Sequence, residues 1–238
     1  MNIITCIHTN SRCYRLKGGT GQYPALPTGI VVHSTGANNP NLKRYVQPSS
    51  DDEHYNELIK EIGKNNNNNS WNREVYKSVH YFIGKDVNGV TRCAFVQPHN
   101  IAAWGVGNGS KGSFNYNPTA KIQFEMCEDN LSNADYALSC FSVATDLCVE
   151  LCLQYNWNAD VIVSHKEAAS MGYASSHGDP DNWWKNFGWN MNLFRQGVQN
   201  RLDNAREEIT DDSQSIKDFK AFVLNEIERM KERIISWK

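Results

Sequence analysis

The stretch Gly29–Thr35, which reads GIVVHST, joins a short apolar run to a polar end. Its β-branched residues predict a buried strand over 28–33 that ends at His33. A similar apolar run at 161–164 ends just before His165. Because functional side chains often emerge where strands end, these two histidines are candidate site residues.

A β-hairpin is predicted in the middle of the chain. Two strand-like runs, 79–84 and 90–96, flank the pair Asn88-Gly89, which is a strong signal for a tight turn between antiparallel strands. The segment 121–127 alternates apolar and polar residues and predicts another strand. These runs would supply the remaining strands of one sheet.

The best helical pattern follows at 132–155, where apolar residues keep spacings of three and four. Ser132 and Asp135 resemble a capping box and are expected to begin this helix. Strands and helices therefore alternate along the chain. This order predicts an α/β fold, with a mixed central β-sheet flanked by helices.

Two segments depart from this pattern. The segment 49–72 is polar and contains five consecutive asparagines, so we interpret it as an insertion loop with a short helix near 54–62.

Beyond residue 202, apolar residues in an acidic and lysine-rich context recur by threes and fours, which predicts an amphipathic helix. We divide the chain into a main domain, 1–205, and this C-terminal helix, 206–238. The helix is expected to dock on its own domain, to mediate a homodimer, or to act as a linker.

Charge and apolar runs exclude several classes of partner. The chain has 24 Lys plus Arg against 26 Asp plus Glu, so no basic field suggests nucleic acid or an anionic membrane surface. Its longest apolar runs are far shorter than the roughly 20 residues of a membrane-spanning helix. The start, MNIITCIH, lacks the features of a secretory signal peptide. We therefore expect synthesis in the cytoplasm.

The cysteines predict no disulfide framework or metal knuckle. There are seven, an odd number, and none forms a Cys-x-x-Cys pair. Cys148 and Cys152 are four residues apart and would share one face of a helix. We expect most of the cysteines to be small buried hydrophobes.

Three candidate residues could form a metal site. His33 and His165 follow predicted strands, and Asp179 lies in the loop His177–Pro180. A catalytic zinc ion takes about three protein ligands from imidazole, carboxylate or thiolate groups and keeps one position open. Each residue taken alone has an ordinary structural interpretation, and the spacing by itself is weak evidence.

An ordered set of motifs resembles a known family. These motifs are GIVVHST at 29–35, SVHYFIG at 78–84, IQFEMCE at 122–128, VSHKE at 163–167 and HGDP at 177–180. They resemble the zinc-dependent N-acetylmuramoyl-L-alanine amidases, which include the peptidoglycan recognition proteins. The tract 164–180 is most similar to endolysins of clostridial phages and prophages. The resemblance covers about residues 2–201.

The resemblance implies roles for individual residues. His33, His165 and Asp179 would be the Zn²⁺ ligands, and Glu125 would move the proton of the attacking water. Glu128 is the rival, because residues three apart on a strand face opposite sides. His177 stands where many relatives have lysine, and it would stabilise the oxyanion or replace Asp179 as a ligand.

The sequence also departs from the family pattern. Val79 stands where some relatives have a catalytic tyrosine, and valine can neither donate nor accept a proton. Gly105 follows Trp104 where many relatives have histidine. Trp104 remains a candidate for stacking on substrate. His80 is a weaker substrate-binding candidate, with a structural role as its alternative.

The function implied is hydrolysis of the amide between N-acetylmuramic acid and L-alanine in peptidoglycan. A cytoplasmically made enzyme of this kind would act on the cell wall after release at lysis, as an endolysin or autolysin, and its C-terminal helix could lead to a wall-binding element. Three alternatives stay open: a non-catalytic peptidoglycan-binding module, a wall endopeptidase on the same fold, and a thiol hydrolase using Cys127 with His80.

Overall fold

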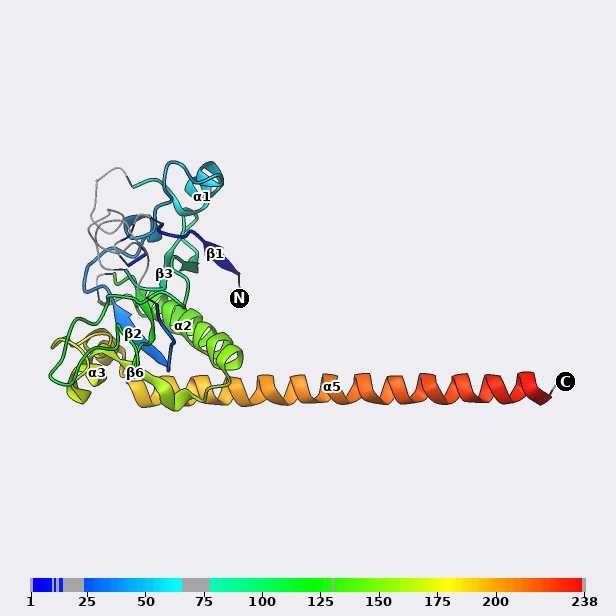
Figure 1. Ribbon diagram of the computed structural model, residues 1–238. Coiled ribbons are helices and arrows are strands. Elements are labelled where there is room, and N and C mark those ends of the chain that lie inside the picture. Colours follow the sequence, from blue (N-terminus) through cyan, green and yellow to red (C-terminus); the bar gives the residue numbers. More distant parts are fainter. Residues whose placement is uncertain are drawn as a thin grey trace.

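The computed structural model describes residues 2–9, 11, 13, 14, 24–65, 78–129 and 131–236. Within the last helix, the side chains of 211–213, 215, 216, 222 and 225–236 are not described. Asn66–Asn69 of the asparagine run, and the rest of the polar insertion to residue 72, lie outside the described residues. Figure 1 shows a rounded body from which one long helix projects.

A single mixed sheet runs through the body, with strand order β1-β4-β3-β5-β2-β6 among the described residues. The strands are β1 (Ile3–Thr5), β2 (Ile30–Ser34), β3 (Tyr81–Lys85), β4 (Thr91–Phe95), β5 (Ile122–Met126) and β6 (Ile162–Ser164). Only β3 and β4 pair antiparallel, and the other neighbours are parallel. This confirms the predicted hairpin and the mixed sheet, and β1 is an edge strand that the sequence pattern did not reveal.

Helices cover both faces of the sheet. The α-helices are α1 (Tyr55–Ile62), α2 (Ala134–Tyr155), α3 (His165–Met171), α4 (Asp181–Trp184) and α5 (Met191–Ser236). Short 3-10 turns lie at Leu42–Arg44, Ala159–Val161 and Lys185–Phe187. The short helix expected near 54–62 is therefore present as α1.

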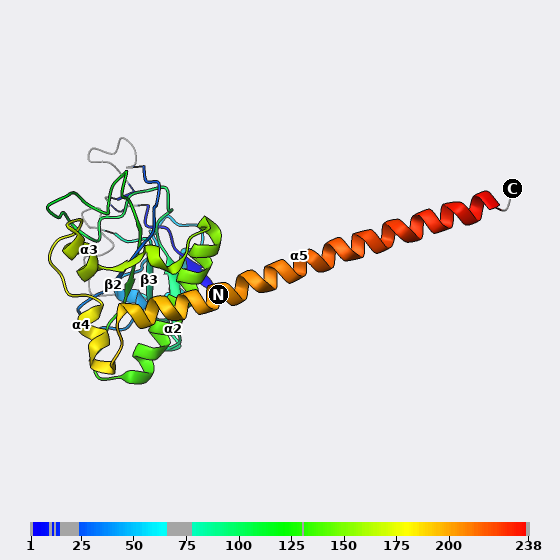
Figure 2. The ribbon, with the colours of Figure 1, turned by 90° about the horizontal axis from the view of Figure 1, so that it is seen from below.

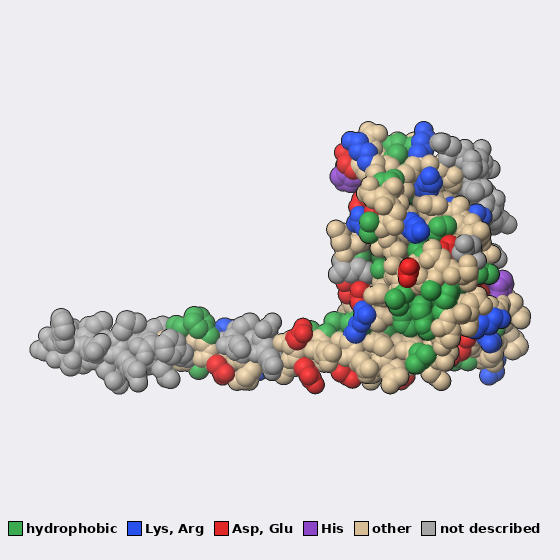
Figure 3. Space-filling model, turned by 180° about the vertical axis from the view of Figure 1, so that it is seen from behind, with side chains coloured by type: hydrophobic (Ala, Val, Ile, Leu, Met, Phe, Trp, Pro, Cys, Tyr) green, Lys and Arg blue, Asp and Glu red, His purple; other side chains and the backbone are tan. Residues whose placement is uncertain are grey.

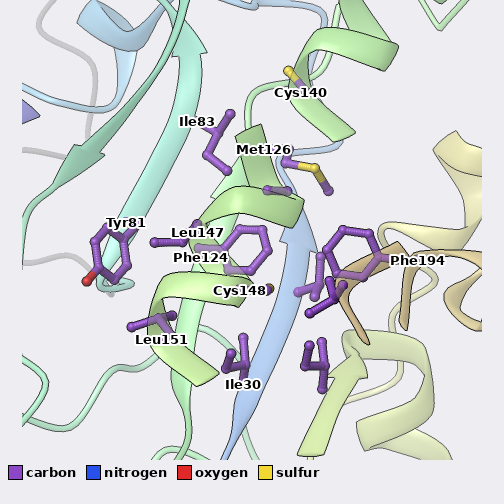
Figure 4. Close-up of a cluster of buried hydrophobic side chains, with 14 of the residues drawn as sticks. Ile30, Tyr81, Ile83, Phe124, Met126, Cys140, Leu147, Cys148, Leu151 and Phe194 are labelled. Carbon is purple, nitrogen blue, oxygen red and sulfur yellow. The ribbon is translucent and has the colours of Figure 1, made fainter. Parts of the chain in front are cut away.

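The larger core lies between the sheet and α2. Figure 4 shows Ile30, Phe124 and Met126 of the sheet against Leu147 and Leu151 of α2. Alternate residues of a strand point to opposite faces, so the residues between these apolar positions project away from α2. This alternation places a second set of side chains, including those of the candidate site, on the opposite face.

The start of α2 differs from the prediction. Asn133, and not the Ser132–Asp135 pair, caps the helix, since its side chain accepts a hydrogen bond from the backbone N–H of Tyr136 at 3.1 Å. The expected capping box does occur elsewhere: Ser164 and Glu167 form one at the start of α3. Both capping side chains satisfy backbone N–H groups that a helix start would leave unpaired.

Helix α2 also has the length and composition of a membrane-spanning helix, although no such helix was expected from the sequence. Half of its most apolar window is buried inside the body. A core helix of a folded domain satisfies the same criteria, and α2 packs on the sheet and on α5. The seven cysteines are buried and free, as predicted.

Helix α5 begins within the body and continues far beyond it, as Figures 1 and 2 show. Phe194, Val198 and Leu202 of its first turns are fully buried against the larger core. The boundary that we drew between 205 and 206 therefore lies inside one continuous helix.

Candidate metal centre

The candidate ligands come from three neighbouring elements. His33 lies on β2, and His165 is the first residue of α3, directly after the adjacent parallel strand β6. Asp179 lies in the loop before α4. Because β2 and β6 run in the same direction, their carboxyl ends meet at one edge of the sheet, and this brings the two histidines together.

The three side chains converge through their polar atoms. The Nδ1 atoms of His33 and His165 are 3.0 Å apart. Asp179 places Oδ2 at 3.2 Å from Nδ1 of His33 and Oδ1 at 3.4 Å from Nδ1 of His165. One ligand atom from each residue lies within 4.8 Å of the others. Their donor chemistry, two imidazoles and a carboxylate, suits a divalent metal ion.

Burial and the contacts among the ligands shift the pKa values of His33 and Asp179. Burial lowers the pKa of His33, and the hydrogen bond and charge of Asp179 only partly oppose that effect. For Asp179, burial alone would raise the pKa, but hydrogen bonds from His165 and His33 hold it below its usual range. A neutral imidazole and an ionised carboxylate are the protonation states that bind metal.

The start of helix α3, where His165 lies, is held by hydrogen bonds to Glu167 and Arg195. Arg195 of α5 donates two hydrogen bonds to Glu167, at 2.8 and 2.9 Å, and a third to the carbonyl of Ile162. Glu167 also accepts from the backbone N–H of Ser164. The first turns of α5 therefore brace the residue that precedes His165.

Two carboxyl groups lie near the cluster. Glu125 is the register partner of His33 on β5, and its buried Oε2 has no hydrogen-bond partner among the described residues. Burial, with added repulsion from Asp179 and Glu128, raises its pKa well above the usual value. Glu128 accepts a 2.5 Å hydrogen bond from Ser34 Oγ, and its pKa is raised by burial first and also by Asp179.

Strand alternation does not separate these two carboxyl groups as we expected. Strand β5 ends at Met126, so Glu128 lies beyond the regular pleat, and both groups sense the charge of Asp179. The hydrogen bond from Ser34 distinguishes them, because it engages Glu128 Oε1, whereas Glu125 Oε2 has no hydrogen-bond partner among the described residues.

His177 lies at the outer side of the cluster. Its ring stacks on His165, with centroids 4.6 Å apart and planes inclined by 23°. Its side chain is 60% exposed, and its Nδ1 is 3.9 Å from Asp179 Oδ1. It thus lies between the ligand set and solvent.

The two weaker substrate candidates differ in position. Trp104 is partly exposed. His80 is 1% exposed, and both its ring nitrogens contact backbone: Nε2 lies 3.0 Å from the carbonyl of Ile101, and Nδ1 accepts from the N–H of Gln123. These contacts fit the structural role that we gave as the alternative for His80.

Gln123 is a buried polar residue near the site that sequence reasoning missed. It precedes Glu125 by two positions on β5, so both side chains lie on the face opposite α2. The available signal was the polar alternation of Gln123 and Glu125 in an otherwise apolar strand.

Comparison with known proteins agrees with these features. Residues 22–182 match the family model described as N-acetylmuramoyl-L-alanine amidase. No curated protein matches the chain at a significant level.

Several solved structures share the fold. The PlyG catalytic domain has 21% sequence identity and a TM-score of 0.51, over 85% of this chain and 96% of that one. PlyL has 20% identity and a TM-score of 0.53, over 84% and 98%. Staphylococcus aureus hydrolase AmiA, in complex with its ligand, has 14% identity and a TM-score of 0.54, over 85% and 83%. These likenesses show that the chain shares their fold.

Proposed function

The chain belongs to the N-acetylmuramoyl-L-alanine amidase family, and we propose that it cleaves peptidoglycan with Zn²⁺ held by His33, His165 and Asp179. The observation that carries this proposal is the convergence of two imidazole nitrogens and one carboxylate within 4.8 Å. Zinc in catalytic sites takes such a set and keeps a position open. The scissile bond joins the lactyl group of N-acetylmuramic acid to L-alanine.

When bound, the zinc ion would supply Lewis-acid activation of water and of the scissile carbonyl. Glu125 would take the proton of the water and return it to the leaving amine. Its burial and its raised pKa suit this role, because a general acid–base works best when its pKa lies near the working pH. His177, stacked on His165 and exposed toward solvent, would donate a hydrogen bond to the oxyanion.

The test is digestion of purified peptidoglycan. We expect new amino groups on alanine without new reducing sugar ends, loss of this product after chelation, and its return with added zinc. His165→Ala should abolish both zinc binding and product, whereas His54→Ala, at a 70% exposed side chain, should change neither. Reducing ends would indicate a glycosidase, and new amino groups on other residues a wall endopeptidase. Activity that survives chelation would instead favour the thiol hydrolase.

For the cellular role we propose an endolysin or autolysin that reaches the wall after lysis. The likeness of fold to the PlyG catalytic domain supports this proposal. Fractionation of expressing cells before and after membrane permeabilisation tests it. Activity found outside intact cells would contradict it.

For helix α5 we propose self-association as a homodimer. Phe219 and Leu224 are 66% and 64% exposed on its projecting part, where Figure 3 shows an apolar patch. An apolar stripe on a solvent-exposed helix is typical of coiled-coil partners. Light scattering should give twice the chain mass for the native protein and the single-chain mass for Phe219→Glu. A native monomer would refute the proposal.

A further inference from the structure

A chain of buried amide groups leads from the loop 106–115 to Gln123, whose side chain lies beside Gly105 near His33. The backbone N–H of Val106 donates to Asn115 Oδ1 at 3.3 Å, and Asn115 Nδ2 donates to the carbonyl of Gly107 at 3.3 Å. An N–H can only donate and a carbonyl can only accept. These two contacts therefore determine which way the Asn115 amide points.

The orientation of Asn115 in turn determines that of Gln123. Gln123 Nε2 donates to Asn115 Oδ1 at 3.0 Å and reaches the carbonyl of Phe114 at 3.5 Å. Both of these atoms are acceptors, so the amide nitrogen must face them, and Oε1 must point the other way. The backbone of Gln123 is held as well, because its N–H donates to His80 Nδ1 at 3.0 Å.

Gln123 Oε1 and His33 Nε2 both lie beside Gly105. A Cβ placed on Gly105 would lie 2.3 Å from Gln123 Oε1 and 3.4 Å from His33 Nε2, so glycine at 105 leaves the space that the amide oxygen occupies. Both atoms are sealed from solvent, and neither has a hydrogen-bond partner of normal geometry among the described residues. A hydrogen bond involving the Gln123 side chain also opposes the lowering of the His33 pKa by burial.

We propose that Gln123 is a positioning residue for the metal centre, whose Oε1 accepts a hydrogen bond from Nε2–H of His33 and so directs the Nδ1 lone pair at the metal. This inference rests on the proposed zinc site. A ligating histidine commonly donates its second ring N–H to a fixed acceptor, which sets the tautomer and ring orientation. Loss of such an acceptor typically weakens metal binding about 10- to 100-fold.

The test compares zinc affinity in two glutamine variants, measured by competition with a chelating dye. Gln123→Leu removes the acceptor, and we expect a zinc dissociation constant about 10- to 100-fold higher. Gln97→Leu is the matched control: Gln97 is 1% exposed and donates to the carbonyls of Ile101 and Ala102. Its loss should lower stability while leaving zinc affinity within about threefold. Equal affinity in Gln123→Leu and the native protein would overturn the inference, and a native protein that binds no zinc would refute the proposed function instead.

A second measurement separates positioning from mere packing. In the zinc-loaded protein, the Nε2–H proton resonance of His33 should lie downfield, as expected for a hydrogen-bonded N–H. It should move upfield in Gln123→Leu and stay in place in Gln97→Leu. A resonance that is unmoved by loss of Gln123 would contradict the proposal.

Gly105→Ala tests the same contact if Gln123→Leu fails to fold. The added methyl group would collide with Oε1 and displace the amide from His33, so zinc affinity should fall. Gly197→Ala on α5, where a Cβ meets nothing within 4 Å, is the control and should bind zinc as the native protein does. Native affinity in a folded Gly105→Ala variant would count against the role of Gln123.

Discussion

Glu125 and His33 lie side by side on the parallel strands β5 and β2, as direct register partners. Both side chains are buried and project from the sheet on the face opposite α2. The sheet therefore delivers a carboxyl group to the metal centre from a rigid strand rather than from a loop. This arrangement leads to the first prediction.

Glu125→Gln should reduce the turnover of peptidoglycan about 100- to 10,000-fold, the range for loss of a general acid–base. Zinc content should stay close to one per chain, because the ligand set is intact. The amide is nearly isosteric with the carboxyl group, so the fold should persist. Released alanine amino groups and bound metal, measured on the same sample, check both expectations.

Glu128→Gln is the matched comparison. Glu128 is held by Ser34 Oγ at 2.5 Å, so its substitution should reduce turnover far less than that of Glu125. If Glu128→Gln were the more damaging change, the proton transfer would belong to Glu128.

His177→Lys should remain active, and its activity should persist to higher pH than that of the native enzyme. The reason is that lysine keeps its positive charge at higher pH than an imidazole does, while the exposed position beside Asp179 accommodates either side chain. The measurement is the pH profile of kcat for both proteins. A profile that the substitution leaves unchanged would remove His177 from the reaction.

Much of the sheet could be predicted because its strands are marked by local patterns. The apolar runs ending at His33 and His165, and the Asn88-Gly89 turn, each signal structure within a few residues. The convergence of Asp179 with these histidines is different, since 146 residues separate it from His33. Spacing alone does not encode such a contact, and it became predictable only through the motif resemblance.

The features that sequence reasoning missed depend on tertiary contacts. The orientation of the Gln123 side chain depends on the acceptors around Asn115 and on the space left by Gly105. A strand pattern reveals none of these contacts. The division at 205 and 206 followed a change in composition, whereas helical hydrogen bonding continues across it. Composition changes where a segment becomes exposed to solvent. Helix α5 leaves the body near that point but continues to Ser236, so the change in composition does not mark the end of an element.

The cap of α2 gives a stability prediction. Asn133→Ala should lower the free energy of unfolding by about 1 kcal/mol, because the N–H of Tyr136 loses its side-chain acceptor. Ser132→Ala leaves this hydrogen bond in place and should cost less. Chemical denaturation of the two variants decides between them, and a larger loss for Ser132→Ala would restore the capping box that the sequence suggested.

The stability of the protein should also depend on pH through His99, whose ring nitrogens lie between the hydroxyls of Tyr81 and Tyr155. Burial lowers the pKa of His99 from 6.5 to about 4. Between these values the unfolded chain binds a proton that the folded chain does not, so the free energy of unfolding must fall as pH falls from about 6.5 to about 4. One such proton contributes at most about 1.4 kcal/mol per pH unit.

His99→Gln should therefore show a shallower loss of stability in this window than the native protein, whereas His54→Gln, at an exposed side chain, should keep the native slope. Denaturation at pH 4.5, 5.5 and 6.5, with metal removed throughout, measures the slopes, and equal slopes for His99→Gln and the native protein would show that His99 takes up its proton equally in both states.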